Sequence, residues 1–261
     1  LLFLNFPNFM NNNNTQRRRK TWWKIPEYIR RIFKFNSMQR DYAFFQMYYL
    51  CTDPQRVYRN IRWLRESKQQ WARDDPAFVV IMIWFLAFAS FSFAIAFHSE
   101  GELFALFKVM LSSIVFDFLG AGMLLSTIFW WVANHWLEKK PQLNTSQHLN
   151  TAQQTNSAQS LHVEWLFAFD IHCNAFFPFF LIVYVVQYFL LPILLTPNSY
   201  FSSFVANALY AAACVIYFHH TVLGYNALLY LQNTVVFFYP AIFALFFLLV
   251  LSLFQYNMSI A

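Results

Sequence analysis

The sequence predicts an all-α integral membrane protein with five transmembrane helices. Of its 261 residues, 59% are hydrophobic and 22% aromatic, whereas only 11% are charged. A soluble domain carries about 25% charged residues, so this chain is too apolar to be solvated on all sides. The apolar residues gather in five stretches, each long enough to cross the ~30 Å hydrocarbon core of a bilayer. The basic residues gather elsewhere: residues 1–77 hold 15 of the 18 Lys and Arg.

The expected transmembrane domain covers residues 76–256. Its first span, 78–97, is a run of 20 residues without a charge. Proline inside a span is tolerated when neighbouring helices satisfy the freed carbonyl group, so Pro178 and Pro192 do not exclude a third span. The remaining spans are expected at about 106–131, 174–195, 203–222 and 234–255.

The N-terminal part of the chain is expected to lie outside the membrane. Residues 1–24 contain an asparagine run and are expected to form a disordered tail, because such a segment buries too little apolar surface to offset its ordering entropy. Residues 25–75 are expected to form a basic, cytosolic or interfacial, amphipathic helical region. Within it, Met38, Tyr42, Phe45 and Tyr49 recur at helical spacing and are expected on one apolar face.

A second helix of this region is expected to begin at Asp53. Aspartate is a favourable N-cap and Pro54 suits the first helical position. Arg56, Arg59 and Arg62 surround its apolar stripe. A basic amphipathic helix next to a span favours contact with a bilayer whose cytosolic leaflet is anionic.

The distribution of Lys and Arg predicts the orientation of the spans. Basic residues are retained on the cytosolic side, so the N-terminus should be cytosolic. Five spans then place the C-terminus in the lumen. The loop after the second span should return to the cytosol and contains a flexible polar linker, residues 142–160.

This topology brings several polar residues to the cytosolic face, where they form a candidate platform. Asp75 and Pro76 suit the N-cap and first position of the first span, whereas Asp74 has no such local role. The expected platform residues are Arg73, Asp74, Asp75, Glu164, Asp170, His172 and His219.

Three further polar residues are expected inside the membrane: Asp117, Asn174 and Asn207. An ionised carboxylate at mid-membrane is unfavourable by roughly 3 kcal/mol or more, so Asp117 should find a partner or be protonated. Asn174, Asn207 and the backbone near Gly120 are candidates. The Gly122-x-x-x-Ser126 spacing permits close helix approach, either within the chain or between copies of it.

Alternative functions remain open at this point. Asp170 and His172 could join Asp74, Asp75 and His219 in a metal or hydrolytic site, because carboxylates and imidazoles bind divalent ions. Asp117, Asp170 and His172 could serve a small transporter or an intramembrane enzyme. The basic head, with its tryptophans, could contact RNA. Because no catalytic, cofactor or RNA-binding motif accompanies these residues, we expect neither enzymatic activity, a cofactor, a metal nor an RNA partner.

Four long motifs are similar to the Unc-fifty family of Golgi membrane proteins: "QMYYLCTDPQRVYRN" at 46–60, "QWARDDPAF" at 70–78, "VEWLFAFDIHCNAFFP" at 163–178 and "LGYNALLYLQNT" at 223–234. The resemblance runs from about residue 28 to 255. It implies a five-span protein of the Golgi and early secretory pathway. It also implies a trafficking role: contact with large exchange factors for ADP-ribosylation factor, and surface delivery of nicotinic acetylcholine receptors. An RNA-binding role at the inner nuclear membrane is a further implication. The resemblance carries over no catalytic residue.

Overall fold

A computed structural model describes residues 39–68, 75–97, 103–139, 162–196 and 199–259. The expected tail 1–24, residues 25–38, Arg73, Asp74 and the linker 142–160 lie outside the described residues. Within them the chain is helical and forms no strand; Glu138 and Leu231 make an isolated bridge. Five helices are long and apolar enough to cross a membrane, which confirms the predicted fold class.

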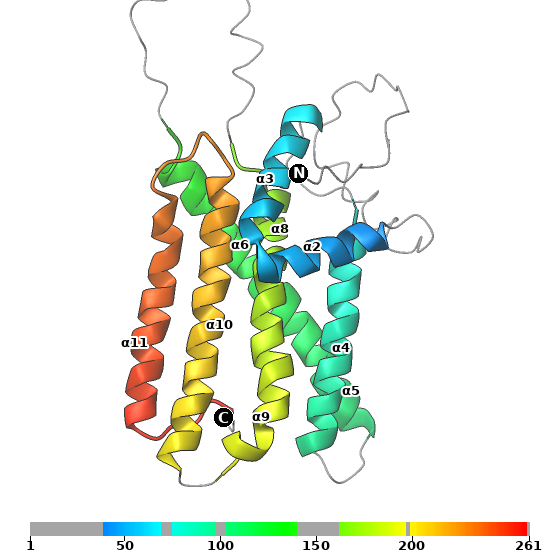
Figure 1. Ribbon diagram of the computed structural model, residues 1–261, viewed down its shortest axis with the longest axis vertical. Coiled ribbons are helices and arrows are strands. Elements are labelled where there is room, and N and C mark those ends of the chain that lie inside the picture. Colours follow the sequence, from blue (N-terminus) through cyan, green and yellow to red (C-terminus); the bar gives the residue numbers. More distant parts are fainter. Residues whose placement is uncertain (1–38, 69–74, 98–102, 140–161, 197–198, 260–261) are drawn as a thin grey trace, which may run out of the picture.

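The five spans run side by side (Figure 1). The first is α4 (Ala77–Phe97) and the fourth is α10 (Tyr200–Asn226). The other three are each built from consecutive helical segments. The second span comprises α5 (Leu103–Ser112), η3 (Ser113–Gly120) and α6 (Ala121–Trp136), and the third comprises α8 (Trp165–Phe180), η4 (Leu181–Val186) and α9 (Gln187–Leu194). The fifth comprises η5 (Thr234–Phe238) and α11 (Tyr239–Leu253).

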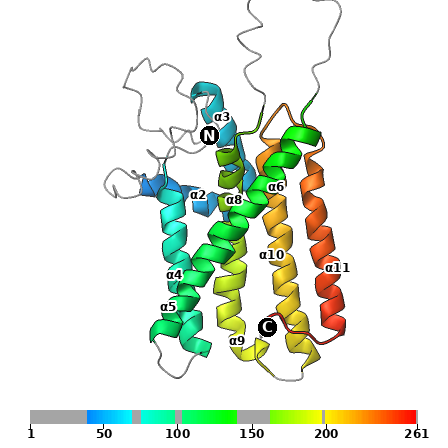
Figure 2. The same ribbon diagram turned by 180° about the vertical axis from the view of Figure 1, so that it is seen from behind.

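The fourth span holds the bundle together. Helix α10 packs against α8 on one side and α11 on the other. The second span crosses the bundle obliquely, from α5 beside α4 to the end of α6 near α10 and α11 (Figure 2). Toward the other end of the bundle, α5 and α11 therefore lie on opposite flanks.

The third span begins earlier than the sequence predicts. The expected segment is 174–195, but the helix starts at Trp165 and ends at Leu194. Asp170 and His172 therefore do not precede the span. They lie within it and are buried, with exposed fractions of 8% and 3%. The prediction treated polar residues as a sign of the membrane surface, but here neighbouring helices enclose them.

Two spans contain a π-helical segment, a wider turn that occurs often at functional sites. In η3 and η4 the helix is closed by i→i+5 bonds: the amide of Ala121 donates to the carbonyl of Phe116, and Gln187 donates to Ile182. Pro178 precedes η4 within α8. Proline has no amide hydrogen for the α-helical ladder, which explains why the regular winding changes near this position.

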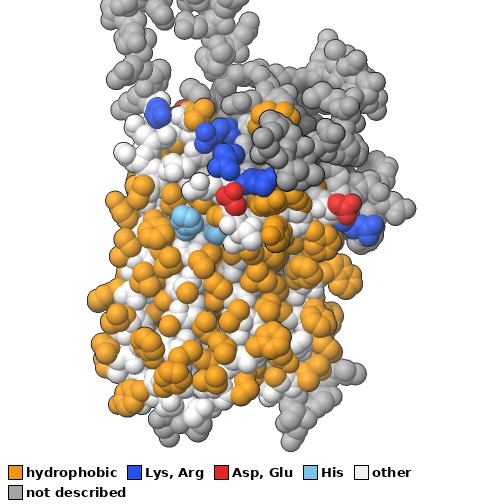
Figure 3. Space-filling model, in the orientation of Figure 1, with side chains coloured by type: hydrophobic (Ala, Val, Ile, Leu, Met, Phe, Trp, Pro, Cys, Tyr) orange, Lys and Arg blue, Asp and Glu red, His pale blue; other side chains and the backbone are white. Residues whose placement is uncertain are grey.

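Among the described residues, two helices precede the spans and cap one end of the bundle. Helix α2 (Arg40–Thr52) lies across this end, roughly perpendicular to the spans, and α3 (Pro54–Lys68) turns away from it (Figure 1). We call this the platform end; it comprises α2, α3 and residues 75–76, 137–139, 162–164 and 227–233. On the face in Figure 3, basic side chains gather at the platform end above a broad hydrophobic band.

Candidate functional site

Helix α2 is fixed to the bundle by a buried apolar face. Ala43, Met47 and Leu50 are at most 3% exposed and join a core cluster with α4 and α8. This face differs from the predicted stripe, because Tyr42 and Phe45 are exposed instead. Aromatic residues at the level of a membrane surface suit an interfacial helix. Helix α2 is therefore packed on one face and open on the other.

A side-chain bond in the middle of α2 ties it to the third span. Nε2 of Gln46 donates to Oδ1 of Asn174 over 3.1 Å, and both residues are buried. Asn174 was expected inside the membrane, as a possible partner of Asp117. It serves α2 instead. The sequence did not indicate a role for Gln46, because this residue is a single polar side chain within an apolar run and its partner lies far away in the chain.

Both ends of α2 are also bonded to spans. At its start, the amide of Gln39 donates to Oδ2 of Asp75 over 2.6 Å. At its end, the carbonyl of Leu50 lies 3.0 Å from Nε2 of His220 and accepts from it in the tautomer that carries the Nε2 proton. That carbonyl belongs to the last turn of a helix, which has no partner within the helix itself. Three bonds, one for each third of α2, thus connect it to α4, α8 and α10.

Asp75 has two structural roles. Its Oδ1 accepts the amide of Ala77 over 3.1 Å, which caps the first span as predicted. Its Oδ2 accepts the amide of Gln39, so one carboxylate joins the starts of two helices. Its partner in sequence, Asp74, lies outside the described residues.

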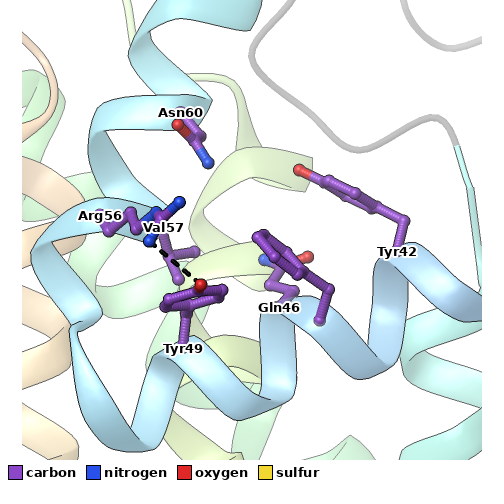
Figure 4. Close-up of a pocket in the computed structure, with 7 residues that line it drawn as sticks. Tyr42, Gln46, Tyr49, Arg56, Val57 and Asn60 are labelled. Carbon is purple, nitrogen blue, oxygen red and sulfur yellow. Dashed lines mark hydrogen bonds between the residues drawn. The ribbon is translucent and has the colours of Figure 1, made fainter. Parts of the chain in front are cut away.

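A small hollow lies between α2 and α3 (Figure 4). Arg56 crosses it: Nη1 donates to the hydroxyl of Tyr49 over 3.0 Å, and the guanidinium lies 4.3 Å from the centre of the Tyr49 ring. A cation above an aromatic face is favourable and keeps the arginine charge available to solvent. The hollow is lined by Tyr42, Phe45, Gln46, Tyr49, Arg56, Val57 and Asn60.

Helix α3 starts as the sequence predicts. Oδ1 of Asp53 accepts the amide of Arg56 over 3.2 Å, the bond expected of an N-cap. Arg59 lies 3.7 Å from Asp53, and both side chains are exposed. Arg62 reaches the bundle, where Nη2 donates to the carbonyl of Asn226. The described half of α3 therefore packs on α10 and presents Arg56 and Arg59 outward.

The loops of the platform end are bonded to each other. The amide of Lys139 donates to the carbonyl of Tyr230, and that of Gln232 donates to Leu137, which joins the end of α6 to residues 227–233. Asn134 both donates to and accepts from the backbone of Val163. The end of the second span thus holds the start of the third. The platform end is a continuous bonded surface rather than a set of independent loops.

The expected platform residues do not converge on one point. Glu164 precedes α8, and its side chain makes no capping bond. His219 is exposed on α10; its neighbour His220 makes the contact with α2. Within the described residues, Asp75, Glu164 and His219 share no hydrogen bond or ion pair with one another. Asp170 is buried in α8. The sequence could not distinguish His219 from His220, which differ only in the face they occupy.

Both ring nitrogens of His172 contact groups within the bundle. Nδ1 lies 2.8 Å from the hydroxyl of Tyr217, and Nε2 lies 3.2 Å from the carbonyl of Phe118. A carbonyl only accepts, so Nε2 donates and Nδ1 accepts the hydroxyl. A Cβ at Gly122 would approach this ring to 2.5 Å, and Ser126 donates to the carbonyl of Ala168. The small residues of the second span therefore serve packing within the chain.

The structure separates Asp117 from His172. Oδ2 of Asp117 accepts the hydroxyl of Tyr184 over 2.8 Å, on an exposed side of the second span. His172 faces inward and bonds to Tyr217 and Phe118. Across the described residues, no three His, Cys, Asp or Glu side chains lie close enough together to hold a metal ion.

Asn207 anchors the C-terminal segment at the opposite end of the bundle. Its Nδ2 donates to the hydroxyl of Ser252 and the carbonyl of Tyr256, and its Oδ1 accepts the amide of Met258. Asn257 donates to the carbonyl of Leu194 over 2.8 Å. Residues 254–259 thus fold back onto the ends of the third and fourth spans, and Asn207 is not a partner of Asp117.

Comparison with known proteins identifies the family. A model of the UNC-50 family matches residues 28–261. A protein unc-50 homolog of Dictyostelium discoideum is 49% identical over 224 residues, which cover 85% of this chain and 80% of that protein. The homolog of Rattus norvegicus is 36% identical over 214 residues, covering 82% and 76%, and that of Danio rerio is 36% identical over 231 residues, covering 87% and 82%. No solved structure matches the chain. With most of its length matched by the family model and by these relatives, the chain belongs to the UNC-50 family.

Proposed function

We propose that this protein is a non-catalytic trafficking scaffold of the Golgi and early secretory pathway. Its platform end faces the cytosol and recruits an exchange factor for ADP-ribosylation factor. Its spans contact client membrane proteins, such as subunits of nicotinic acetylcholine receptors, and support their delivery to the surface. The C-terminal segment is lumenal. Membership of the UNC-50 family supports this proposal, together with the built and bonded surface at one end of the bundle.

The rigid support beneath α2 is the observation on which recruitment rests. Three spans contribute bonds to α2, although its outer face carries exposed aromatic side chains such as Phe44 and Tyr48. A surface that is held rigidly can bind a partner without a large loss of conformational freedom. Aromatic residues and arginine are also the residues enriched where proteins bind one another.

The positive charge at the platform end favours a partner with an acidic surface. Arg56 lines the hollow of Figure 4 and Arg59 is exposed on the same helix, and the two charges favour an acidic segment of the exchange factor. The exposed aromatic side chains of α2 lie at the ends of the spans, where they contact the headgroups of an anionic cytosolic leaflet. The leaflet and the acidic segment would then cover adjacent parts of the platform end.

Affinity capture from Golgi membranes tests recruitment. The full-length protein should enrich a large exchange factor for ADP-ribosylation factor, and the double substitution R56E/R59E should reduce that enrichment at least several-fold. The matched control is R40E, an exposed charge reversal at the other end of α2. If the wild type captures no exchange factor, or if R40E has the same effect as R56E/R59E, recruitment by the hollow is wrong.

Glycosylation reporters test the orientation. A reporter sequence fused after residue 261 should be glycosylated in cells, whereas the same reporter placed before residue 1 should not. The reverse pattern would place the platform end in the lumen and exclude contact with a cytosolic exchange factor. Glycosylation of both reporters would contradict an odd number of spans.

A further inference from the structure

The carboxylate of Asp117 lies on an exposed side of the second span, about half-way along it. The span runs from Phe104 to Trp136, so its midpoint is close to Gly120. The partner of Asp117, Tyr184, belongs to the span Trp165–Leu194, ten residues or about 15 Å of helix from the end opposite the platform. Both counts place the pair near the centre of a hydrocarbon core of ~30 Å.

This pair joins the two π-helical segments of the bundle. Asp117 belongs to η3 and Tyr184 to η4, and the hydroxyl of Tyr184 donates to Oδ2 over 2.8 Å. The Tyr184 ring is held by aromatic neighbours, Phe93 at 6.2 Å and Phe180 at 5.6 Å between ring centres. The direction of the hydroxyl is therefore fixed by packing. Wide turns that coincide with a polar pair at mid-membrane are typical of a functional position.

The described part of the chain offers Asp117 no cation. The ion pairs found there involve Asp53 and Glu138, not Asp117. Lys108 is exposed on the same span, but nine residues separate it from Asp117, on the order of 10 Å along the helix axis. Asn174 and Asn207, the partners expected from the sequence, are bonded to α2 and to the C-terminal segment. With Oδ2 bonded to Tyr184, Oδ1 remains available to a donor from outside the bundle.

The surface around Asp117 is apolar and open. Phe116 is 68% exposed and Leu124 is 64% exposed. Of the five spans, the second has the smallest share of its most apolar window buried, 17%. Gly122 and Ser126 face inward against the third span, so they are not available to pack a second copy closely. A carboxylate within such a surface is unfavourable against lipid chains and favourable against a helix that brings a positive charge.

We propose that Asp117, presented by Tyr184, is an intramembrane docking site for one transmembrane helix of a client, and that this helix carries an arginine or lysine near its centre. The basic group donates to the free carboxylate oxygen, while the apolar flanks of the client helix pack on Phe116 and Leu124. This inference rests on the proposed contact between the spans and client membrane proteins. It assigns that contact to one residue and gives the client a recognisable chemistry.

A reconstituted system tests the site with defined probes. The full-length protein is placed in phosphatidylcholine vesicles and titrated with synthetic helices of leucine and alanine, anchored by terminal tryptophans. One helix carries a central arginine, and the matched helix carries leucine there. Energy transfer between labelled protein and helix measures binding. The arginine helix should bind roughly tenfold more tightly than the leucine helix, and D117N should abolish that difference.

Two further variants keep the result interpretable. Y184F removes the donor but keeps the carboxylate, so it should still prefer the arginine helix. D117K should prefer a helix with a central glutamate, which a merely structural role for Asp117 would not produce. Equal binding of the arginine and leucine helices to the wild type would overturn the proposal. So would dimerisation of the wild type that D117N abolishes, because the occupant would then be a second copy.

The same variant separates this inference from recruitment. Residue 117 belongs to η3 and not to the platform end, so the D117N variant should capture the exchange factor as well as the wild type does. If the wild type captures no exchange factor but still prefers the arginine helix, recruitment fails and the docking site stands. If capture succeeds and the helix preference is absent, the docking site fails alone.

Discussion

Two buried asparagines each tie a segment outside the spans to one end of the bundle, but they do so in different settings. Asn174 bonds to Gln46 beneath α2, where Ala43, Met47 and Leu50 are also buried. Asn207 bonds to Tyr256 and Met258 of residues 254–259, a segment whose members are half-buried or exposed. The first segment is held by apolar packing as well as hydrogen bonds, whereas the second is held mainly by hydrogen bonds.

The difference teaches how each end should respond to change. An apolar side chain that is fully buried contributes about 1.5–3 kcal/mol, whereas a single hydrogen bond contributes a net of about 1 kcal/mol. Helix α2 should therefore remain docked when one bond is lost. The C-terminal segment should be loosened when Asn207 is replaced, although Asn257 still donates to the carbonyl of Leu194. The docking of α2 should therefore be less sensitive to the loss of one hydrogen bond than the docking of the C-terminal segment.

Removal of apolar packing beneath α2 should have the largest effect. Leu50 is 1% exposed, so L50A should lower the free energy of unfolding by about 2–4 kcal/mol. Phe44 is on the outer face of α2 and 51% exposed, so F44A is the matched control and should change stability by less than about 0.5 kcal/mol. Unfolding of the purified protein in detergent micelles measures both. Equal effects would mean that α2 is not docked as described.

Replacement of Asn207 should come next. N207L removes two hydrogen bonds to the C-terminal segment and one to Ser252 of α11, and should lower stability by about 1–3 kcal/mol. Carboxypeptidase should then remove the last residues much faster than in the wild type. N174L provides the comparison, because it should leave the C-terminal segment protected. Rapid removal in the wild type itself would contradict the anchoring of this segment.

The bond between Gln46 and Asn174 should have a smaller, non-additive effect. Each single substitution, Q46L or N174L, leaves a buried amide without its partner and should destabilise the protein by about 1–2 kcal/mol. The double variant replaces both amides by apolar groups and should recover most of that loss. A double variant that loses the sum of both single effects would show that the two residues act independently.

The rate of alkylation at Cys51 reports whether α2 stays docked in these variants. Partial burial raises the pKa of the Cys51 thiol above its usual value, so less thiolate is present at pH 8. Release of α2 would lower that pKa and speed alkylation, which mass spectrometry can measure at this residue. L50A, which removes apolar packing beneath α2, should therefore be alkylated faster than the wild type, whereas N174L, in which α2 stays docked, should resemble the wild type.

The smallest effect is expected for the exposed pair of Arg59 and Asp53. The atoms are 3.7 Å apart and both side chains are largely in solvent, so R59A should change stability by less than about 0.5 kcal/mol. Its effect, if any, should fall on capture of the exchange factor. A loss of stability comparable to that of L50A would mean that α3 carries more of the fold than its packing indicates.

The sequence predicted that there are five spans because hydrophobic length is a property of single segments. It also predicted the caps at Asp53 and Asp75, which depend on local bonds. It did not predict the partners of Gln46, His220 or Asn207, since each bond joins residues that lie far apart in the chain. Asp170 and His172 were placed outside the membrane for the same reason: their polarity was visible, but the helices that enclose them were not.

The π-helical segments change which residues of a span lie on the same face. A π turn contains about one more residue than an α turn, so it acts as a single inserted residue between two regular helices. Residues 103–112 and 121–136 are therefore out of phase, and no single periodicity describes both. Deletion of Val115 alone would remove that extra residue and leave a regular helix in which the two halves keep nearly the same relative rotation. The half that packs on α4 and the half that packs on α8 could then still both face the bundle, whereas deletion of one residue within either α-helical half would rotate the residues beyond it by about 100°.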